Sequence, residues 1–504
     1  MPYLCYDLKA IQAFIFRIPK LKYIIGGSAI IDQFDRDIAP LHAQKVGADP
    51  VSCGGGKGGF YCPDDSIAAK LEKALVDAAH SEGLDVRIGI DADYSNASTT
   101  ANRLYSFVPE MTDDHPCRIS GLYPTADEDG HPIVQRRVTT DHVRKYERRL
   151  SELLGLKLLA DMPNAEFLRS VDPDDADGSG AAGFRSIGGI RRWAVICMDG
   201  NDMGLQFRAM KGRNPDEIQN WVQAMSSALD ETAKHSCAAG MCAVLNRWKR
   251  DQEVSESTYR DRDELRTVLP LRPLIVGGDD IAVICHAAYA FDFVKAAMEA
   301  WTSVSSEKAS SSKFKAGLWP ATGGRLTVSA GVFFCPSSMP LHAAVSYAEL
   351  LQASAKRKGR EISNNPPTPC CLDWESATES MLDTPIARRR RELEFVDADI
   401  NKSVKLTQRP YSLQEFKSLE ALRDQLGRDI PVSVRHEILP GLRQGAHDRT
   451  LFRYRIMKSY RELGSRLDEL ATDSWWTQTD KGLSTGLIDA LSLLEEEARS
   501  EENR

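Results

Sequence analysis

The segment Leu274-Ile-Val-Gly-Gly-Asp-Asp-Ile-Ala-Val-Ile-Cys285 places two adjacent acidic residues between two apolar runs. Both runs are rich in Val and Ile, which predicts two buried strands. Gly277 and Gly278 allow the tight turn of a hairpin, so we expect Asp279 and Asp280 at its tip. Neighbouring carboxylates repel each other, and a divalent cation is the simplest way to offset their charge. Taken alone, the segment also fits a solvated turn without a ligand.

A second apolar strand that ends in acids is predicted by Trp193-Ala-Val-Ile-Cys-Met-Asp-Gly-Asn-Asp-Met-Gly204. Its acids are Asp199 and Asp202. A strand that ends in Asp, beside a hairpin that carries two Asp residues, is the layout of a nucleotidyl-transferring palm domain. Such sites hold two Mg²⁺ ions about 4 Å apart, which clamp the attacking and leaving oxygens of a phosphoryl group. We therefore expect Mg²⁺ or Mn²⁺ as the cofactor; a simple strand cap is the alternative for Asp199.

The same order of elements is predicted twice along the chain. The first copy has a strand over 3–7, two helices with a break at Gly26-Gly27, a hairpin over 51–62, a helix over 66–80 and a strand over 84–91. The second copy has the strand with Asp199, a helix, the hairpin with Asp279, a helix over 288–304 and a strand over 326–334. The element order repeats but the residues do not. Because the first hairpin, Gly54-Gly-Gly-Lys57, lacks carboxylates, we interpret the first copy as a binding or structural unit and the second as catalytic.

These patterns divide the chain into four regions. They are a first palm domain over 1–110, a helical connector with an acidic linker over 111–186, a second palm domain over 187–364 and a helical domain over 365–504. Amphipathic periodicity over 141–168 predicts the connector helix, and the charged stretch 251–266 predicts a solvated insertion. Within the helical domain we interpret the run Arg388–Arg391 as a solvated helix face rather than an RNA contact.

Composition argues against several other classes of protein. The formal net charge of −8 gives no overall positive field for nucleic acid. No apolar run approaches the roughly 20 residues needed to span a bilayer, and the chain does not open on a basic stretch followed by an apolar one. The eleven cysteines show no paired CxxC spacing, which favours reduced thiols. We therefore expect a cytoplasmic protein without membrane contact.

Five ordered motifs resemble those of a known family. They are Asp7–Phe16 with Gly26-Gly-Ser28, Gly54–Lys57, Asp199–Gly204, Gly277–Asp280, and Thr327–Gly331 followed by Lys356 and Gly359-Arg360. In this order they resemble the large polymerase-like subunit of type III CRISPR effector complexes, which makes cyclic oligoadenylates. The last motif is also similar to that of GGDEF diguanylate cyclases. More loosely, Arg409–Leu413 resembles the start of the family's helical C-terminal domain.

The resemblance implies an α+β fold with two ferredoxin-like palm domains and a helical C-terminal domain. It implies that a ribose hydroxyl attacks the α-phosphate of ATP and expels pyrophosphate, with Asp199, Asp279 and Asp280 as catalytic metal ligands. The product would be a cyclic oligoadenylate with 3′-5′ phosphodiester bonds. The family's usual Asp-Gly-Asp reads Asp199-Gly-Asn-Asp202 here, so Asp202 is a further candidate metal ligand, and its role relative to Asn201 stays open.

The resemblance also implies nucleotide contacts on both copies. We expect them at Gly200, Gly277, Gly278, Lys356 and Arg360 on the second copy, and at Ser28, Gly55, Gly56 and Lys57 on the first. The two sets would hold the triphosphate and the acceptor nucleotide, respectively. Turn geometry alone is the alternative for the glycines, and a solvated helix-end lysine is the alternative for Lys356.

Two departures from the family limit the expected chemistry. The family often carries an HD nuclease domain, but here His447-Asp448 stands in the helical tail without further ligands. It often carries a cysteine zinc site between the palms, but Cys117 stands without a paired cysteine. We therefore expect neither HD nuclease activity nor zinc.

Three functions are compatible with the sequence. The first is a cyclic oligoadenylate synthase that works with other effector subunits, guide RNA and target RNA. The second is a stand-alone cyclic dinucleotide synthase. The third is a non-catalytic scaffold subunit.

Overall fold

The computed structural model describes residues 2–9, 11–15, 21–103, 165–166, 192–210, 213–254, 267–268, 270–314, 317–336, 339–377, 383–459, 476–479 and 482–501. Within these ranges the chain is an α+β protein with four sheets. The acidic linker, Cys117 and most of the charged stretch 251–266 lie outside the described residues. So does most of the expected connector helix, whose described residues Ala165–Glu166 form strand β5, parallel to β7 (Thr267–Val268). At these two residues the expected helix is wrong.

The first unit is a four-stranded antiparallel sheet with helices packed on it. Its elements are β1 (Tyr3–Lys9), α1 (Ile11–Ile15), α2 (Leu21–Gln33), the π-helix η1 (Phe34–Ile38), α3 (Ala39–Val46), β2 (Asp49–Gly54), β3 (Lys57–Tyr61), α4 (Asp65–Ser81), β4 (Asp85–Asp91) and α5 (Tyr94–Arg103). The strand order is β2-β3-β1-β4. The expected break at Gly26-Gly27 is wrong, because α2 runs through both glycines. An added Cβ at Gly27 would lie 3.1 Å from Ile15 Cα, so the glycine serves close packing against α1 rather than a turn.

The second unit repeats this arrangement around a larger sheet. Its elements are β6 (Arg192–Gly200), α9 (Met203–Ala209), α10 (Pro215–Val254), β8 (Leu271–Gly277), β9 (Asp280–His286), the 3-10 turn η2 (Ala287–Tyr289), α11 (Ala290–Ser311), β10 (Val328–Pro336) and α12 (Leu341–Ile362). Its first four strands have the order β10-β6-β9-β8. In both units the fourth strand therefore lies next to the first, and the first next to the third, which is the ferredoxin-like βαββαβ arrangement. The predicted repeat of element order is confirmed.

The sheet of the second unit continues beyond residue 364, where the sequence suggested a boundary. Strand β11 (Cys371–Ser376) pairs in parallel with β10, and β14 (Tyr411–Ser412) pairs with β11. The region after residue 370 is also less helical than expected. It contains α13 (Pro385–Leu393), α14 (Leu413–Asp429), α15 (Val432–Leu442), α16 (Ala446–Ser459) and α18 (Leu487–Glu501), and a sheet of β12 (Glu394–Asp397), β13 (Lys402–Lys405), β16 (Gly482–Ser484) and β15 (Thr477–Thr479).

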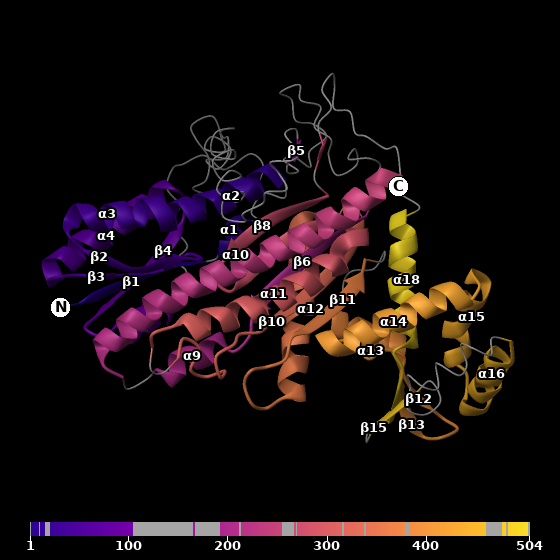
Figure 1. The fold of residues 1–504 in the computed structure, drawn as a ribbon. Coiled ribbons are helices and arrows are strands. Elements are labelled where there is room, and N and C mark those ends of the chain that lie inside the picture. The colour runs from indigo at the N-terminus through magenta and orange to yellow at the C-terminus, as the bar shows by residue number, and fades with distance from the viewer. Residues whose placement is uncertain are drawn as a thin grey trace.

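Two hydrophobic clusters run through both units and join them. Alternate residues of β1 enter different clusters, Tyr3 and Cys5 one and Leu4, Tyr6 and Leu8 the other. Strand β6 does the same, because successive side chains point to opposite faces of a strand. The long helix α10 passes along both units, with contacts to β2 and to β8 (Figure 1). The packing thus fixes the position of one sheet relative to the other.

No helix in the described part of the chain is both long and apolar enough to cross a membrane.

Candidate active site

The two glycine-containing hairpins meet tip to tip between the units. Strands β2 and β3 turn at Gly55 and Gly56, and strands β8 and β9 turn at Gly278 and Asp279. An added Cβ at Gly55 would lie 3.9 Å from Gly278 Cα, so the two backbones approach closely. Gly55, Gly56 and Gly278 all have positive φ (64°, 79° and 59°), which requires glycine at these turns.

Three carboxylates gather at the tip of the second hairpin. Asp199 at the end of β6 is the register partner of Asp280 at the start of β9. Asp279 stands at the turn between β8 and β9, and its carbonyl accepts a hydrogen bond from Gly200 N at 3.0 Å. An added Cβ at Gly200 would lie 3.0 Å from Asp279 Cβ, so this glycine lets the turn approach the strand end. The sequence prediction that Asp199 lies beside the Asp279-Asp280 hairpin is confirmed.

The negative charge of this group is not fully balanced. The pKa of Asp280 is raised to about 7, first by desolvation between the two units and then by Asp279 and Asp199. The pKa of Asp279 is raised by desolvation and by repulsion from Asp199, while Lys356 and Lys57 oppose the shift. The Asp280 residue is exposed in the cleft. Protein atoms nevertheless surround its carboxylate closely enough to disfavour the charged form. The site therefore favours a cation.

Lys356 of α12 supplies part of the missing positive charge. Its Nζ pairs with Asp199 Oδ2 at 2.6 Å and donates to the carbonyl of Gly200 at 2.9 Å. One helical turn earlier, Gln352 Nε2 donates to Asp199 Oδ2 at 3.2 Å. Lys356, which we expected to contact a triphosphate, thus forms an ion pair with Asp199 at the end of β6.

The neighbouring pair Asn201 and Asp202 faces other partners. Asn201 is buried; its Nδ2 donates to Thr327 Oγ1 at 3.1 Å, and its Oδ1 accepts from Ser329 Oγ at 2.9 Å. The two Asp202 carboxylate oxygens accept from Thr368 N at 2.7 Å and from Thr368 Oγ1 at 2.9 Å. Asn201 therefore joins β6 to β10, and Asp202 holds the loop before β11. The carboxylate of Asp202 is engaged away from Asp280, although the sequence suggested it as a metal ligand.

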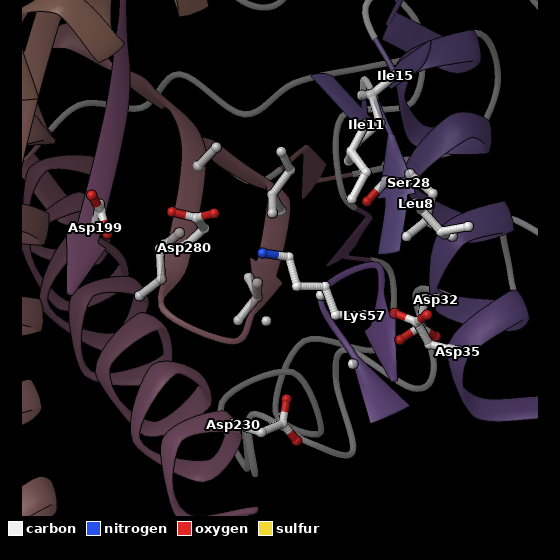
Figure 2. Close-up of a pocket in the computed structure, with 18 of the residues that line it drawn as sticks. Leu8, Ile11, Ile15, Ser28, Asp32, Asp35, Lys57, Asp199, Asp230 and Asp280 are labelled. Atoms are coloured by element: carbon white, nitrogen blue, oxygen red, sulfur yellow. The ribbon is translucent and has the colours of Figure 1, made fainter. Parts of the chain in front are cut away.

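A cavity of about 670 Å³ lies between the two units, beside the hairpins (Figure 2). From the second unit Asp199, Gly277 and Asp280 line it. From the first unit come Ser28, Gly55 and Lys57 and an apolar wall of Leu8, Ile11, Ile15 and Ile31. Figure 2 shows the Lys57 amine pointing into the space between Asp280 and the first unit. The structure thus brings residues predicted on separate copies into one pocket.

Of the expected nucleotide contacts, four line the pocket, namely Ser28, Gly55, Lys57 and Gly277. Five do not, namely Gly56, Gly200, Gly278, Lys356 and Arg360. Ser28 lines the pocket, but its Oγ donates to the carbonyl of Leu274 at 2.7 Å, which ties α2 to β8. Gly56 is buried beneath Ile11. Arg360 is exposed in the last turn of α12, one turn beyond Lys356, and is not among the residues that line the pocket.

Several pocket residues were missed in the sequence. Glu349 and Gln352 stand on the helix face of Lys356, and their spacing of three to four residues could have revealed them. Asp35 of η1 and Asp230 and Lys234 of α10 also line the pocket. Nothing in the sequence pattern brings these residues to the hairpins, because they belong to helices that reach the pocket only in the folded chain.

Asp199, Asp279 and Asp280 are the residues of this site that could hold a divalent cation. In the described ranges no group of three or more His, Cys, Asp and Glu side chains is arranged to hold a metal ion by itself, and Lys356 occupies one oxygen of Asp199. Mg²⁺ is usually held by one or two carboxylates together with substrate phosphates rather than by a complete protein cage. Asp199, Asp279 and Asp280 offer such a partial set, and their uncompensated charge favours a divalent cation.

Comparison with known protein families identifies the class of the second unit. Residues 192–363 match the family model described as Cas10/Cmr2, second palm domain. This segment begins at β6 and ends just after α12, so it contains the Asp279-Asp280 hairpin, Asp199 and Lys356. The chain therefore carries a palm domain of the Cas10/Cmr2 family. A comparison with curated proteins found no match.

Solved structures of a Csm1–Csm4 cassette are similar to this chain. The Csm1–Csm4 cassette in complex with cA3 matches with 13% identity and a TM-score of 0.50, over 98% of this chain and 69% of that chain. The cassette in complex with cA4 matches with 14% identity and a TM-score of 0.43, over 84% of this chain and 57% of that chain. The chain thus spans between about half and about two thirds of these proteins. At such identities the likeness concerns the fold alone.

Proposed function

We propose that this protein is a nucleotidyltransferase of type III CRISPR defence that converts ATP into a cyclic oligoadenylate. The observation that carries the proposal is the pocket shared by the two units. There the acidic hairpin of a Cas10/Cmr2 palm meets a hairpin that has no acids and carries Lys57. We take the first unit as a degenerate palm, since it repeats the strand order of the second. One nucleotide would bind on each side of the pocket.

The proposed reaction joins the two nucleotides. The 3′ hydroxyl of the acceptor attacks the α-phosphorus of the donor ATP, a P–O bond forms, the bond to the β-phosphate breaks, pyrophosphate leaves and the hydroxyl proton passes to solvent. Repetition and a final ring closure give the cyclic product. Mg²⁺ or Mn²⁺ held by Asp199, Asp279 and Asp280 supplies charge neutralisation and lowers the pKa of the attacking hydroxyl.

The side chains of this chain would position the reactants. Lys356 neutralises Asp199 in the structure described here; a cation bound to Asp199 would release the Lys356 ammonium to the triphosphate. Gly277 and Gly278 would leave room for the nucleotide at the backbone. Lys57 would reach the phosphates from the first unit, and the apolar wall around Ile11 and Ile15 would face the acceptor base.

The proposed setting is an RNA-guided effector complex. One of the similar solved structures is titled a Csm1–Csm4 subcomplex in the type III-A CRISPR–Csm interference complex. By analogy we propose that other effector subunits, guide RNA and target RNA bind this protein and switch on synthesis. A stand-alone cyclic dinucleotide synthase and a scaffold subunit are the competing functions, and the raised pKa values of Asp279 and Asp280 argue against the scaffold.

Mass spectrometry of the products tests this proposal. Purified protein, alone and assembled with its copurifying subunits, guide RNA and target RNA, is incubated with ATP and Mg²⁺ or Mn²⁺. A cyclic oligoadenylate formed only by the RNA-bound assembly supports the proposal. A cyclic dinucleotide formed by the protein alone supports the stand-alone synthase, and absence of pyrophosphate under every condition supports the scaffold.

A further inference from the structure

A buried carboxylate lies directly behind the glycine hairpin of the first unit. Asp35 of the π-helix η1 is only 2% exposed. Its Oδ2 accepts a hydrogen bond from Gly56 N at 2.7 Å, and its Oδ1 accepts one from the Tyr6 hydroxyl at 2.7 Å. Figure 2 shows Asp35 on the side of the pocket opposite Asp199. The proposed mechanism assigns it no task.

Gly56 has no room to move once these contacts are made. Its carbonyl accepts from Leu8 N at 2.7 Å, while its N–H is held by Asp35. An added Cβ on Gly56 would lie 2.1 Å from Ile11 Cδ1, which closes the third side. The peptide at Gly56 is therefore fixed by β1, α1 and η1 together.

Tyr6 connects the carboxylate to the next part of the hairpin. Its ring fills the space beneath Gly58, where an added Cβ would lie 2.2 Å from Tyr6 Cε1. The same ring directs its hydroxyl to Asp35. Tyr6 thus supports β3 through its ring and orients Asp35 through its hydroxyl.

The residues on either side of Gly56 are those that reach the catalytic hairpin. Gly55 approaches the backbone of Gly278, and Lys57 points into the pocket. The contact from Asp35 to Gly56 therefore sets both the approach of the two hairpins and the direction of Lys57.

The π-helix also joins the second unit. Arg36, next to Asp35, donates through Nε to Asp32 Oδ1 at 2.6 Å and pairs through Nη2 with Asp230 of α10 at 3.4 Å. Single π-turns are rare and are frequent at functional sites. One short segment therefore holds the glycine hairpin on one side and the long helix of the catalytic unit on the other.

We propose that Asp35 is a positioning residue for nucleotide joining: by holding Gly56 N–H it keeps the glycine hairpin against the catalytic hairpin and keeps Lys57 aimed at the bound nucleotides. This inference rests on the proposed function. Asp35 touches neither Asp199 nor the Asp279-Asp280 pair, so its loss should weaken nucleotide binding on the first unit more than the chemical step.

Steady-state kinetics of the active assembly test the proposal. Asp35→Ala is expected to raise the KM for ATP on the order of tenfold, the effect of losing one buried hydrogen bond, with a smaller change in kcat. Asp35→Asn is expected to stay within about threefold of wild type, because its carbonyl oxygen can accept from Gly56 N–H while its amide donates to Tyr6. Asp37→Asn, in the same π-helix but outside the pocket lining, is the matched control.

Amide hydrogen exchange over residues 54–57 provides a readout that needs no activity. We expect faster exchange in Asp35→Ala and unchanged exchange in Asp35→Asn and Asp37→Asn. If Asp35→Ala does not fold, Asp35→Glu replaces it, because the longer side chain keeps the charge but displaces the acceptor. Unchanged KM and unchanged exchange in the Ala or Glu variant would overturn the proposal. A wild-type assembly that releases no pyrophosphate would instead overturn the proposed function, and hydrogen exchange would still decide the contact of Asp35.

Discussion

At the scale of single residues, Lys356 can pair either with Asp199 or with the triphosphate of a bound nucleotide. It neutralises Asp199 in the structure, and in the proposed reaction it meets the triphosphate. We expect Lys356→Met to lower the rate of pyrophosphate release roughly 100-fold, the usual effect of losing one group that stabilises developing charge. The matched control is Lys358→Met, two residues along α12 and therefore on another side of the helix; equal activity of the two variants would contradict the assignment.

Asp35 predicts a pH dependence of stability. Desolvation raises its pKa to about 7, although Gly56 and Tyr6 oppose the shift. Its titratable or charged neighbours are Tyr6, Cys53, Asp32 and Arg36. The pKa of Cys53 is raised to about 12 and that of Tyr6 lies well above its usual value, so neither titrates near neutrality.

Between about pH 4 and pH 7 the folded state binds more protons at Asp35 than the unfolded state. The free energy of unfolding therefore falls as pH rises over this range. Asp35→Asn has no carboxyl group to titrate at this position. The free energy of unfolding of the variant should therefore rise relative to that of wild type as the pH increases from 5 to 8. Urea unfolding at both pH values measures the change, and Asp37→Asn should not show it. A constant difference between Asp35→Asn and wild type would mean that the pKa of Asp35 is not raised.

At the scale of elements, helix α13 is anchored to the second sheet by a buried ion pair. Arg389 donates through Nη1 and Nη2 to the carboxylate of Asp373, at 2.9 and 2.7 Å, and through Nε to Glu375 at 2.9 Å. The interpretation of Arg388–Arg391 as a solvated face is therefore wrong for Arg389, which is buried. Its partners stand on β11, the strand that carries the sheet beyond residue 364.

We expect Arg389→Ala to lower the free energy of unfolding by about 3–5 kcal/mol, because it leaves Asp373 buried without its ion-pair partner and leaves Glu375 with Arg409 alone. Arg390→Ala, at the exposed next position of α13, should change it by no more than about 0.5 kcal/mol. Chemical denaturation monitored by circular dichroism compares the two variants. Similar effects of both would contradict the anchoring of α13 through Arg389.

The same strand shows why part of the fold escaped prediction. The strands around Asp199 and the Asp279-Asp280 hairpin follow from apolar runs, and the repeat follows from element order. Strand β11 carries Asp373 and Glu375 among its buried residues, so its pattern does not resemble a buried strand until Arg389 is placed. The glycines led to the opposite error, the prediction of a break where there is none. Gly27 lies inside α2 and allows close packing there.

The site was predicted where its residues share a motif and missed where folding brings them together. Asp199, Asp279, Asp280 and Lys356 belong to ordered motifs, and the structure gathers them. Asp35 and Asp230 reach the pocket from helices far apart in sequence, which no local pattern reveals. The ion pair of Lys356 with Asp199 depends on the exact packing of α12 on β6, and for this reason the sequence suggested the lysine but not its partner.

At the scale of the whole molecule, the two units form one site. Ser28 bonds to Leu274, Tyr3 bonds to Gln219 and Arg36 pairs with Asp230, each across the boundary between the units. The pocket takes Asp199 and Asp280 from one unit, and Lys57 and the apolar wall from the other. A scaffold needs neither the close approach of two glycine turns nor paired acids that repel each other.

Pyrophosphate release from ATP by the RNA-bound assembly tests the central claim most directly. Wild type is compared with Asp279→Asn/Asp280→Asn and with Asp64→Asn/Asp65→Asn, another adjacent acidic pair, at the start of α4, where Asn can still cap the helix. We predict Mg²⁺- or Mn²⁺-dependent release in wild type and in the Asp64/Asp65 variant, and its loss in the Asp279/Asp280 variant. Release that is equal in all three proteins, or absent from wild type, would contradict the account.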